Sequence, residues 1–208
     1  MNNPITKISS ICVFCGSSTG RGEAYAANAR LLGKAIVKNN CNLVYGGSNI
    51  GLMRILADEV LSGGGKVTGV MPNGLADKEI AHKGIHDLHL VDTMHERKAM
   101  MASMSDAFIA MPGGLGTLDE IFEILSWNQL DIISKPTALY NVDGYYDHLL
   151  RFLDHTVDEH FVRPEHRANL LVDDEAERLM KKILDFIPQK PPSKWVDELK
   201  VATKKLLL

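Results

Sequence analysis

Residues 107–120, Ala-Phe-Ile-Ala-Met-Pro-Gly-Gly-Leu-Gly-Thr-Leu-Asp-Glu, decide how this chain folds. The apolar run 107–111 is typical of a buried β-strand, and residues 118–130 have the spacing of an amphipathic helix. A strand, a glycine-rich turn and a helix are the elements with which α/β proteins hold phosphate. The stretch therefore predicts an α/β fold with an anion site at the turn.

The turn also indicates chemistry. Gly113, Gly114 and Gly116 leave backbone N–H groups uncovered, and Thr117 adds a hydroxyl where a helix dipole favours an anion. Glu120 follows one turn later and brings a carboxylate close to whatever the turn binds. Chemistry on a phosphorylated metabolite is one interpretation. The other is a T-x-x-E capping box between Thr117 and Glu120, which needs no ligand.

Apolar runs alternate with helix-period segments along the rest of the chain. Further strands are expected at 8–15, 41–45, 67–71, 85–91 and 137–140. Further helices are expected at 24–39, 50–61, 93–105, 144–157 and 174–186. Near-continuous apolar strands alternating with helices indicate a parallel sheet buried on both faces. We predict a single-domain, doubly wound, Rossmann-like sheet with helices on both faces. The glycine turns at 16–20, 46–47 and 113–116 then meet at one sheet edge, where such folds bind ligands.

Composition limits the function without choosing it. The chain has 208 residues with 45% hydrophobic and 24% charged content, and its net charge of −3 gives no reason to expect nucleic-acid binding. No apolar stretch is long enough for a membrane span, and the polar start is unlike a signal peptide, so a cytoplasmic location is expected. Residues 1–187 are predicted to form the catalytic domain. Residues 188–208, with Pro191-Pro192 and several lysines, are predicted to form a linker and a short amphipathic helix.

Other motif interpretations fail on spacing. The 16–20 turn lacks the G-x-G-x-x-G dinucleotide pattern, and Gly63-Gly64-Gly65-Lys66 precedes a strand, unlike a Walker A loop. The 16–20 turn also matches G-x-S-x-G, but it follows the first strand, whereas a hydrolase elbow needs earlier strands. Cys12 and Cys15 are an odd number of residues apart in one strand, so their sulfurs should face opposite sides. The H-E-x-x-H zinc pattern is absent at His95-Glu96.

Several segments together resemble the LOG ("Lonely Guy") family of phosphoribohydrolases. The resemblance covers residues 8–172 and rests on the complete P-G-G-x-G-T-x-x-E signature at 112–120 and on Met-His-Glu-Arg-Lys-Ala-Met at 94–100. It is supported by Tyr-Gly-Gly at 45–47, Gly-Leu-Met at 51–53, Trp127, Gln-Leu at 129–130 and Asn-Val-Asp-Gly-Tyr-Tyr at 141–146. Two glycines common in the family are replaced here by Ser48 and Arg54, which puts the substrate preference in question.

The resemblance implies hydrolysis of the N-glycosidic bond of a nucleoside 5′-monophosphate, including cytokinin nucleotides. Arg97 and Glu120 are the expected catalytic residues, because an oxocarbenium-like ribose needs a nearby negative charge, a positioned water and help for the departing base. The expected binding residues are Gly16, Ser17, Gly46, Gly47, Glu79, Met94, Lys98, Gly113, Gly114, Gly116 and Thr117. Glu79 and Met94 are assigned to the base.

The resemblance further implies a homodimer or larger homo-oligomer, and a reaction without metal or organic cofactor. Two alternatives stay open at this point. One is a nucleosidase acting on AMP or other purine nucleotides without a cytokinin role. The other is a non-catalytic, Rossmann-like carrier that uses the same glycine cradle, although a passive binder would not need both Arg97 and Glu120.

Overall fold

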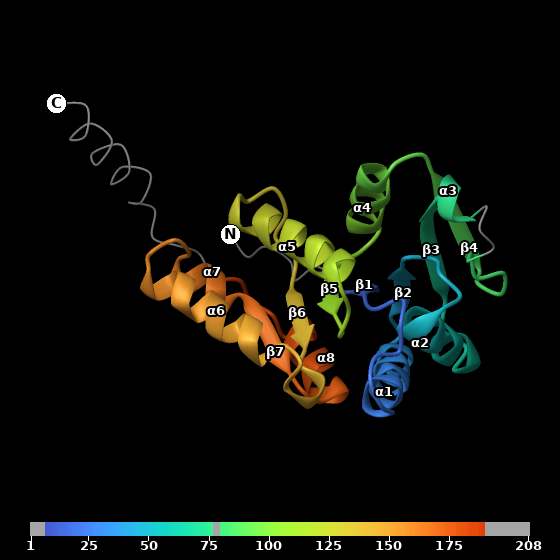
Figure 1. Cartoon of the computed structure of the whole chain (residues 1–208), viewed down its shortest axis with the longest axis horizontal. Helices are drawn as coiled ribbons and strands as arrows, with labels where there is room; N and C mark the ends of the chain where they lie inside the picture. Colours follow the sequence, from blue (N-terminus) through green and yellow to red (C-terminus); the bar gives the residue numbers. More distant parts are fainter. Residues whose placement is uncertain (1–6, 77–79, 190–208) are drawn as a thin grey trace.

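A seven-stranded parallel sheet forms the centre of the computed structural model, which describes residues 7–76 and 80–189 (Figure 1). Its strands are β1 (Ser10–Phe14), β2 (Asn42–Tyr45), β3 (Val67–Pro72), β4 (Asp87–Val91), β5 (Ala107–Ala110), β6 (Thr137–Tyr140) and β7 (Leu170–Asp173). The strand order is β4-β3-β2-β1-β5-β6-β7. The chain therefore winds outward from β1 to β4, returns to β5 beside β1, and winds outward again.

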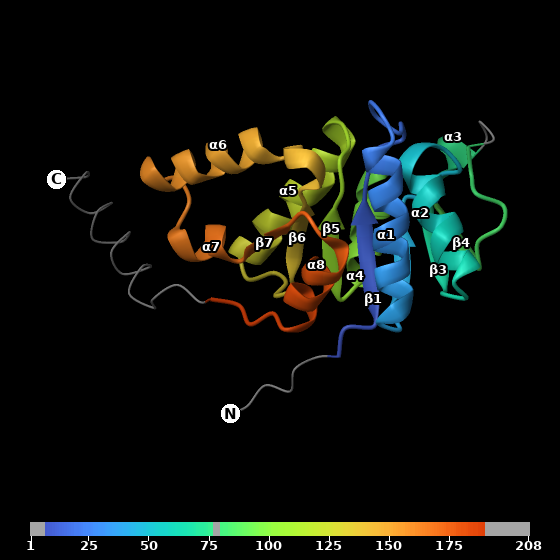
Figure 2. The ribbon, with the colours of Figure 1, turned by 90° about the horizontal axis from the view of Figure 1, so that it is seen from below.

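Helices cover both faces of this sheet. They are α1 (Ala24–Lys38), α2 (Gly51–Ser62), α3 (Asn73–Ala76), α4 (Met94–Ser103), α5 (Leu115–Gln129), α6 (Asp147–Asp158), α7 (Pro164–Ala168) and α8 (Ala176–Leu184), with a 3₁₀ turn, η1, at Val142–Gly144. Figures 1 and 2 show α1 and α2 on the face opposite α4 and α5. Helix α8 shares a buried apolar cluster with α1 and α2, and α6 packs against the cluster formed by α4 and α5.

The predicted doubly wound, single-domain fold is confirmed, since every strand and helix predicted between residues 8 and 186 is present. Cys12 and Cys15 also lie in the two separate apolar clusters on opposite faces of the sheet, as their spacing predicts. Strand β7 and the short helices α3 and α7 are additional to the prediction, because runs of four or five residues carry little periodicity. The predicted C-terminal helix lies outside the described residues.

The start of α5 differs from the prediction. The helix begins at Leu115, three residues before the predicted start at 118. Glycine disfavours helix interiors, so the local sequence around Gly116 does not predict a helix. Gly116 nevertheless lies in the first turn of α5. Because of this earlier start, Thr117 is the third residue of α5 and not the residue before the helix, and Glu120 is the sixth residue and not the third.

The reversal of strand order places the ligand edge between β1 and β5. The loops that follow these strands are joined, because the Gly16 N–H donates to the Pro112 carbonyl oxygen at 3.0 Å. The Leu52 N–H of α2 donates to the Gly16 carbonyl oxygen at 3.1 Å. Gly51 has a φ of +60°, and a Cβ there would run into the Ser17 backbone. The glycine loops are thus tied to one another and to the start of α2.

Candidate active site

A cavity of about 290 Å³ opens at the carboxyl ends of β1, β2 and β5. It is lined by eight of the residues predicted for the site: Gly16, Ser17, Gly46, Arg97, Gly114, Gly116, Thr117 and Glu120. The other lining residues are Val13, Phe14, Cys15, Met53, Met101 and Leu115. The convergence of the three glycine turns at one sheet edge is therefore observed, and residues more than 100 positions apart meet there.

The N-terminus of α5 faces this cavity without a side-chain cap. Gly114 is the N-cap residue, and no side chain among the described residues makes a capping hydrogen bond to the helix. Leu115, Gly116 and Thr117 form its first turn and line the cavity, and the N–H groups of a first turn have no partner within the helix. Uncapped N–H groups and the positive end of the helix dipole favour an anion at this position.

The capping-box interpretation of Thr117 and Glu120 is wrong. Thr117 is the third residue of α5, so its hydroxyl cannot cap that helix. A capping box of the same T-x-x-E pattern occurs instead at the start of α4. There the Thr93 hydroxyl accepts from the Glu96 N–H at 3.1 Å, and the Glu96 carboxylate accepts from the Thr93 N–H at 3.3 Å. This box fixes the first turn of α4, from which Arg97 projects.

Arg97 and Glu120 form a largely buried ion pair in the cavity. Arg97 Nη1 lies 3.2 Å from Glu120 Oε1, and the two side chains are 11% and 8% exposed. Arg97 Nε also donates to the Val70 carbonyl oxygen of β3 at 3.1 Å, which fixes the plane of the guanidinium. A Cβ at Gly46 would overlap Arg97 Nη2, so the glycine at the end of β2 makes room for this side chain.

Burial raises the pKa of Glu120 above its ordinary value, and the opposing charge of Arg97 does not cancel this effect. A carboxylate with a raised pKa accepts a proton more readily than an exposed carboxylate does. The pair thus combines a fixed positive charge with a carboxylate whose proton affinity is increased.

Five predicted binding residues are not among the described residues that line the cavity. Lys98 reaches from α4 to α5, where its ammonium pairs with Asp119 at 3.1 Å and Glu123 at 3.3 Å. Met94 is 44% exposed, with its sulfur 4.0 Å from Arg97 Nη1. Glu79 lies outside the described residues.

Gly47 and Gly113 are the other two, and both shape the loops from behind. Gly47 has a φ of +75°, and a Cβ there would come within 3.0 Å of Leu88 Cδ1. At Gly113 a Cβ would overlap the Thr117 hydroxyl, so this glycine lets the loop fold tightly over the first turn of α5.

The two departures from the family pattern have different surroundings. Ser48 is buried and forms an isolated antiparallel bridge with Ala81. Arg54 is exposed on α2, and its Nε pairs with Asp58 Oδ2 at 3.3 Å. Neither is among the described residues that line the cavity, so an effect of Ser48 or Arg54 on the substrate preference would not come from lining this cavity.

Besides Leu115, five residues that line the cavity were not predicted for the site. Val13, Phe14 and Cys15 come from the end of β1, and Met53 and Met101 come from α2 and α4. Their periodicity marks them only as core residues, and just Met53 lies in a segment that carried the resemblance. Across residues 7–76 and 80–189, no three His, Cys, Asp or Glu side chains are close enough to hold a metal ion.

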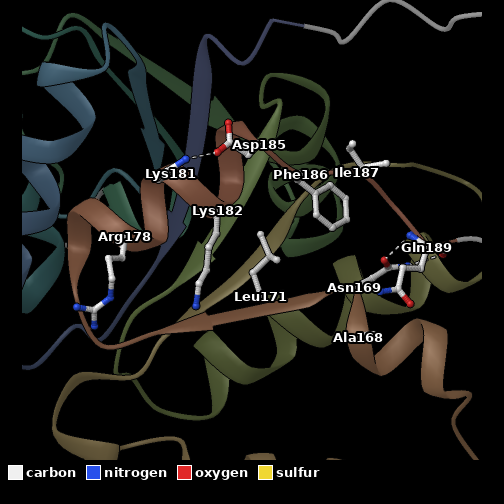
Figure 3. Close-up of a pocket in the computed structure, with 10 residues that line it drawn as sticks. All are labelled: Ala168, Asn169, Leu171, Arg178, Lys181, Lys182, Asp185, Phe186, Ile187 and Gln189. Atoms are coloured by element: carbon white, nitrogen blue, oxygen red, sulfur yellow. Dashed lines mark hydrogen bonds and ion pairs between the residues drawn. The ribbon is translucent and has the colours of Figure 1, made fainter.

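A larger cavity of about 460 Å³ lies between β7 and α8 (Figure 3). Its cations are matched by carboxylates: Lys181 pairs with Asp185 at 2.7 Å, and Lys182 pairs with Asp173 at 2.8 Å. Arg178 also pairs with Asp173, at 2.9 Å. This cavity brings together none of the predicted site residues, so the smaller cavity at the switch point is the better candidate. In the described part of the chain, no helix is both long and apolar enough for a membrane span.

Comparison with known proteins gives matches over most of the chain. The sequence profile of a family described as "Possible lysine decarboxylase" matches residues 53–183. "Probable cytokinin riboside 5′-monophosphate phosphoribohydrolase LOGL9" from Oryza sativa subsp. japonica is 47% identical over 178 residues, covering 86% of this chain and 78% of the relative. "Cytokinin riboside 5′-monophosphate phosphoribohydrolase LOG1" from Arabidopsis thaliana is 46% identical over 184 residues, covering 88% and 86%.

A solved structure shares the fold. The molybdenum cofactor binding protein from Rippkaea orientalis has a TM-score of 0.65 at 22% identity, covering 86% of this chain and 96% of that one. At this identity the likeness concerns the arrangement of strands and helices alone.

Proposed function

The chain belongs to the LOG family of cytokinin riboside 5′-monophosphate phosphoribohydrolases, and from this membership we propose that it hydrolyses the N-glycosidic bond of an adenine nucleoside 5′-monophosphate. The products are the free base, plain or N6-substituted, and ribose 5-phosphate. The observation that carries the proposal is the Arg97–Glu120 pair, 3.2 Å apart, beside the uncapped start of α5 in one cavity. A non-catalytic nucleotide carrier needs the anion site but does not need the buried Arg97–Glu120 pair.

The 5′-phosphate binds at the start of α5 in this proposal. The N–H groups around Gly114, Gly116 and Thr117 receive the phosphate, and Gly16 and Ser17 close the site from β1. Gly46 adjoins the Arg97 guanidinium. Gly47 and Gly113 contribute by shaping their loops, while contacts of Met94, Lys98 and Glu79 with the substrate stay predictions.

Glu120 and Arg97 perform the chemistry. As the bond between the anomeric carbon and the base nitrogen breaks, its electron pair leaves with the base and positive charge develops on the ribose. The Glu120 carboxylate stabilises that charge and accepts a proton from the attacking water, whose oxygen forms the new bond to the anomeric carbon. Arg97 holds the phosphate or ribose and stabilises the leaving base, and the proton that Glu120 took from the water passes to the base nitrogen, which restores the carboxylate. The charge signs and the raised pKa of Glu120 support these roles.

The setting of the activity is part of the proposal. We assign the catalytic domain to residues 1–187 and treat residues 188–208 as an appendage. The protein works in the cytoplasm as a homodimer or larger homo-oligomer, without a metal or organic cofactor. Sedimentation of the purified chain tests the oligomeric state.

Incubation with two nucleotides tests the activity. Purified protein is mixed with AMP and, separately, with isopentenyladenosine monophosphate, and free base and ribose 5-phosphate are measured by chromatography. Equal amounts of both products from the prenylated nucleotide support the proposal. Activity on AMP alone keeps the hydrolase assignment but restricts it to a purine nucleotide nucleosidase without a cytokinin role. Binding without release of base from either nucleotide supports a carrier and overturns the enzyme assignment.

A further inference from the structure

Two adjacent tyrosines hold backbone carbonyls of the glycine loop after β5. The Tyr146 hydroxyl donates to the Met111 carbonyl oxygen at 2.7 Å, and the Tyr145 hydroxyl donates to the Gly113 carbonyl oxygen at 2.6 Å. Tyr146 is 1% exposed, whereas Tyr145 is 42% exposed. The two hydrogen bonds thus hold the loop on either side of Pro112: Tyr146 does so from the core and Tyr145 from the surface.

The turn after β6 is built to present these side chains. Asp143 and Gly144 both have positive φ, at 50° and 69°, which bends the chain sharply. Asn141 stabilises the bend, because its Oδ1 accepts from the Tyr146 N–H at 2.7 Å and its Nδ2 donates to Asp147 Oδ1 at 2.8 Å. The conformation of the turn is therefore fixed independently of the loop that the tyrosines hold.

A third tyrosine extends the contact to the glycine loop after β1. The Tyr145 ring meets the Tyr146 ring edge to face at 4.9 Å between centroids, and the Tyr25 ring edge to face at 5.8 Å. A Cβ on Gly20 would lie 2.7 Å from Tyr25 Cδ2, so Tyr25 lies directly against that loop. One row of aromatic rings connects the two loops that border the cavity.

The Tyr145 hydrogen bond has a specific consequence for the anion site. The Gly113 carbonyl and the Gly114 N–H belong to one planar, trans peptide group, so fixing the carbonyl also fixes the direction of the N–H. Glycine on both sides makes rotation of this peptide group cheap, because each residue has a wide choice of φ and ψ. Gly114 lines the cavity and is the N-cap of α5. A hydrogen bond to the Gly113 carbonyl oxygen from outside the loop therefore restricts the direction of the Gly114 N–H.

We propose that Tyr145 is a positioning residue for phosphate: its hydroxyl, through the Gly113 carbonyl oxygen 2.6 Å away, orients the Gly113–Gly114 peptide so that the Gly114 N–H serves the anion site at the start of α5. This inference rests on the proposed function, since it takes that site to bind the 5′-phosphate. Tyr146 supports the same loop from the core.

The test is Tyr145→Phe, which removes the hydroxyl and keeps the ring in its aromatic row. Losing a neutral hydrogen bond that orients one phosphate donor should raise the dissociation constant of ribose 5-phosphate about two- to tenfold, measured by calorimetry. The KM for the nucleotide should rise by the same factor with kcat within about twofold, and adenine binding should be unchanged. Tyr140→Phe is the matched control, because its hydroxyl donates to Asn28 Oδ1 at 2.6 Å. It should leave ribose 5-phosphate binding unchanged.

The outcomes separate this inference from the proposed function. Unchanged ribose 5-phosphate binding in Tyr145→Phe overturns the inference, as does an equal loss for ribose 5-phosphate and adenine, which would mean general distortion. The binding measurement does not depend on turnover. If the wild-type chain binds ribose 5-phosphate but releases no base from any nucleotide, the hydrolase proposal fails while the role of Tyr145 is still measured.

Discussion

Replacing Glu120 by Gln should abolish catalysis while making the protein more resistant to heat. The carboxylate is 8% exposed and 3.2 Å from Arg97 Nη1, so its charge acts in a poorly solvated site. Removing one such stabilising or proton-accepting group costs about 10²- to 10⁴-fold in kcat, or roughly 3–5 kcal/mol in activation free energy. The KM should change little, since the phosphate contacts lie on the helix start. The loss in kcat is measured from the rate at which base is released, as monitored by chromatography.

The stability effect follows from the pKa of Glu120, which burial raises above its ordinary value. The folded state therefore binds this proton more tightly than the unfolded state, and the associated stability is present at low pH and lost as the pH rises through the raised pKa. Glutamine resembles the protonated form at every pH. The melting temperature of Glu120→Gln should match the wild type near pH 4 and exceed it increasingly toward pH 8.

Glu123→Gln is the matched control, because it makes the same change one turn later on α5, where Glu123 pairs with Lys98 at 3.3 Å. Its kcat should stay within about twofold of the wild type, since Glu123 is not among the residues that line the cavity and Lys98 keeps its second partner, Asp119, at 3.1 Å. Two results would contradict these roles of Glu120: a Glu120→Gln variant that turns over nucleotide at more than a tenth of the wild-type rate, or one that melts below the wild type at pH 8.

Three further changes test other parts of the site. Arg97→Lys keeps the charge but cannot hold its backbone contact and Glu120 together, so kcat/KM should fall about 100-fold in steady-state assays, and full activity would contradict its role. Gly51→Ala places a Cβ against the Ser17 backbone and should lower the unfolding free energy in urea by more than about 1 kcal/mol beyond Gly64→Ala, which shares a positive φ but meets open space; equal losses would contradict the contact. Dialysis against EDTA should leave turnover unchanged, and activity restored only by added metal would show that the reaction depends on a metal ion.

Much of the fold follows from local patterns in the sequence. Apolar strands alternating with helices predicted the doubly wound sheet, and the glycine turns after β1, β2 and β5 predicted the ligand edge. Local patterns could not place α5 correctly, because Gly116 lowers helix propensity while the first turn tolerates it. They also suggested one T-x-x-E capping box at Thr117, whereas the actual box is at Thr93.

The partners across the fold were harder to predict. Arg97 and Glu120 belonged to the same predicted site, but their direct contact and the anchoring of Arg97 on Val70 depend on how α4 crosses β3. Tyr145 stood in a segment that carried the family resemblance without an assigned role, and only the folded turn after β6 brings its hydroxyl to Gly113. Such contacts between distant segments have no periodic signal in the sequence.

A crystal structure of Glu120→Gln with an intact nucleoside 5′-monophosphate would show how the substrate lies in the cavity. The proposed binding mode places the 5′-phosphate on the N–H groups at the start of α5, around Gly114, Gly116 and Thr117, and the anomeric carbon beside Arg97 and position 120. A phosphate bound away from this helix start, or an anomeric carbon out of reach of both side chains, would contradict it.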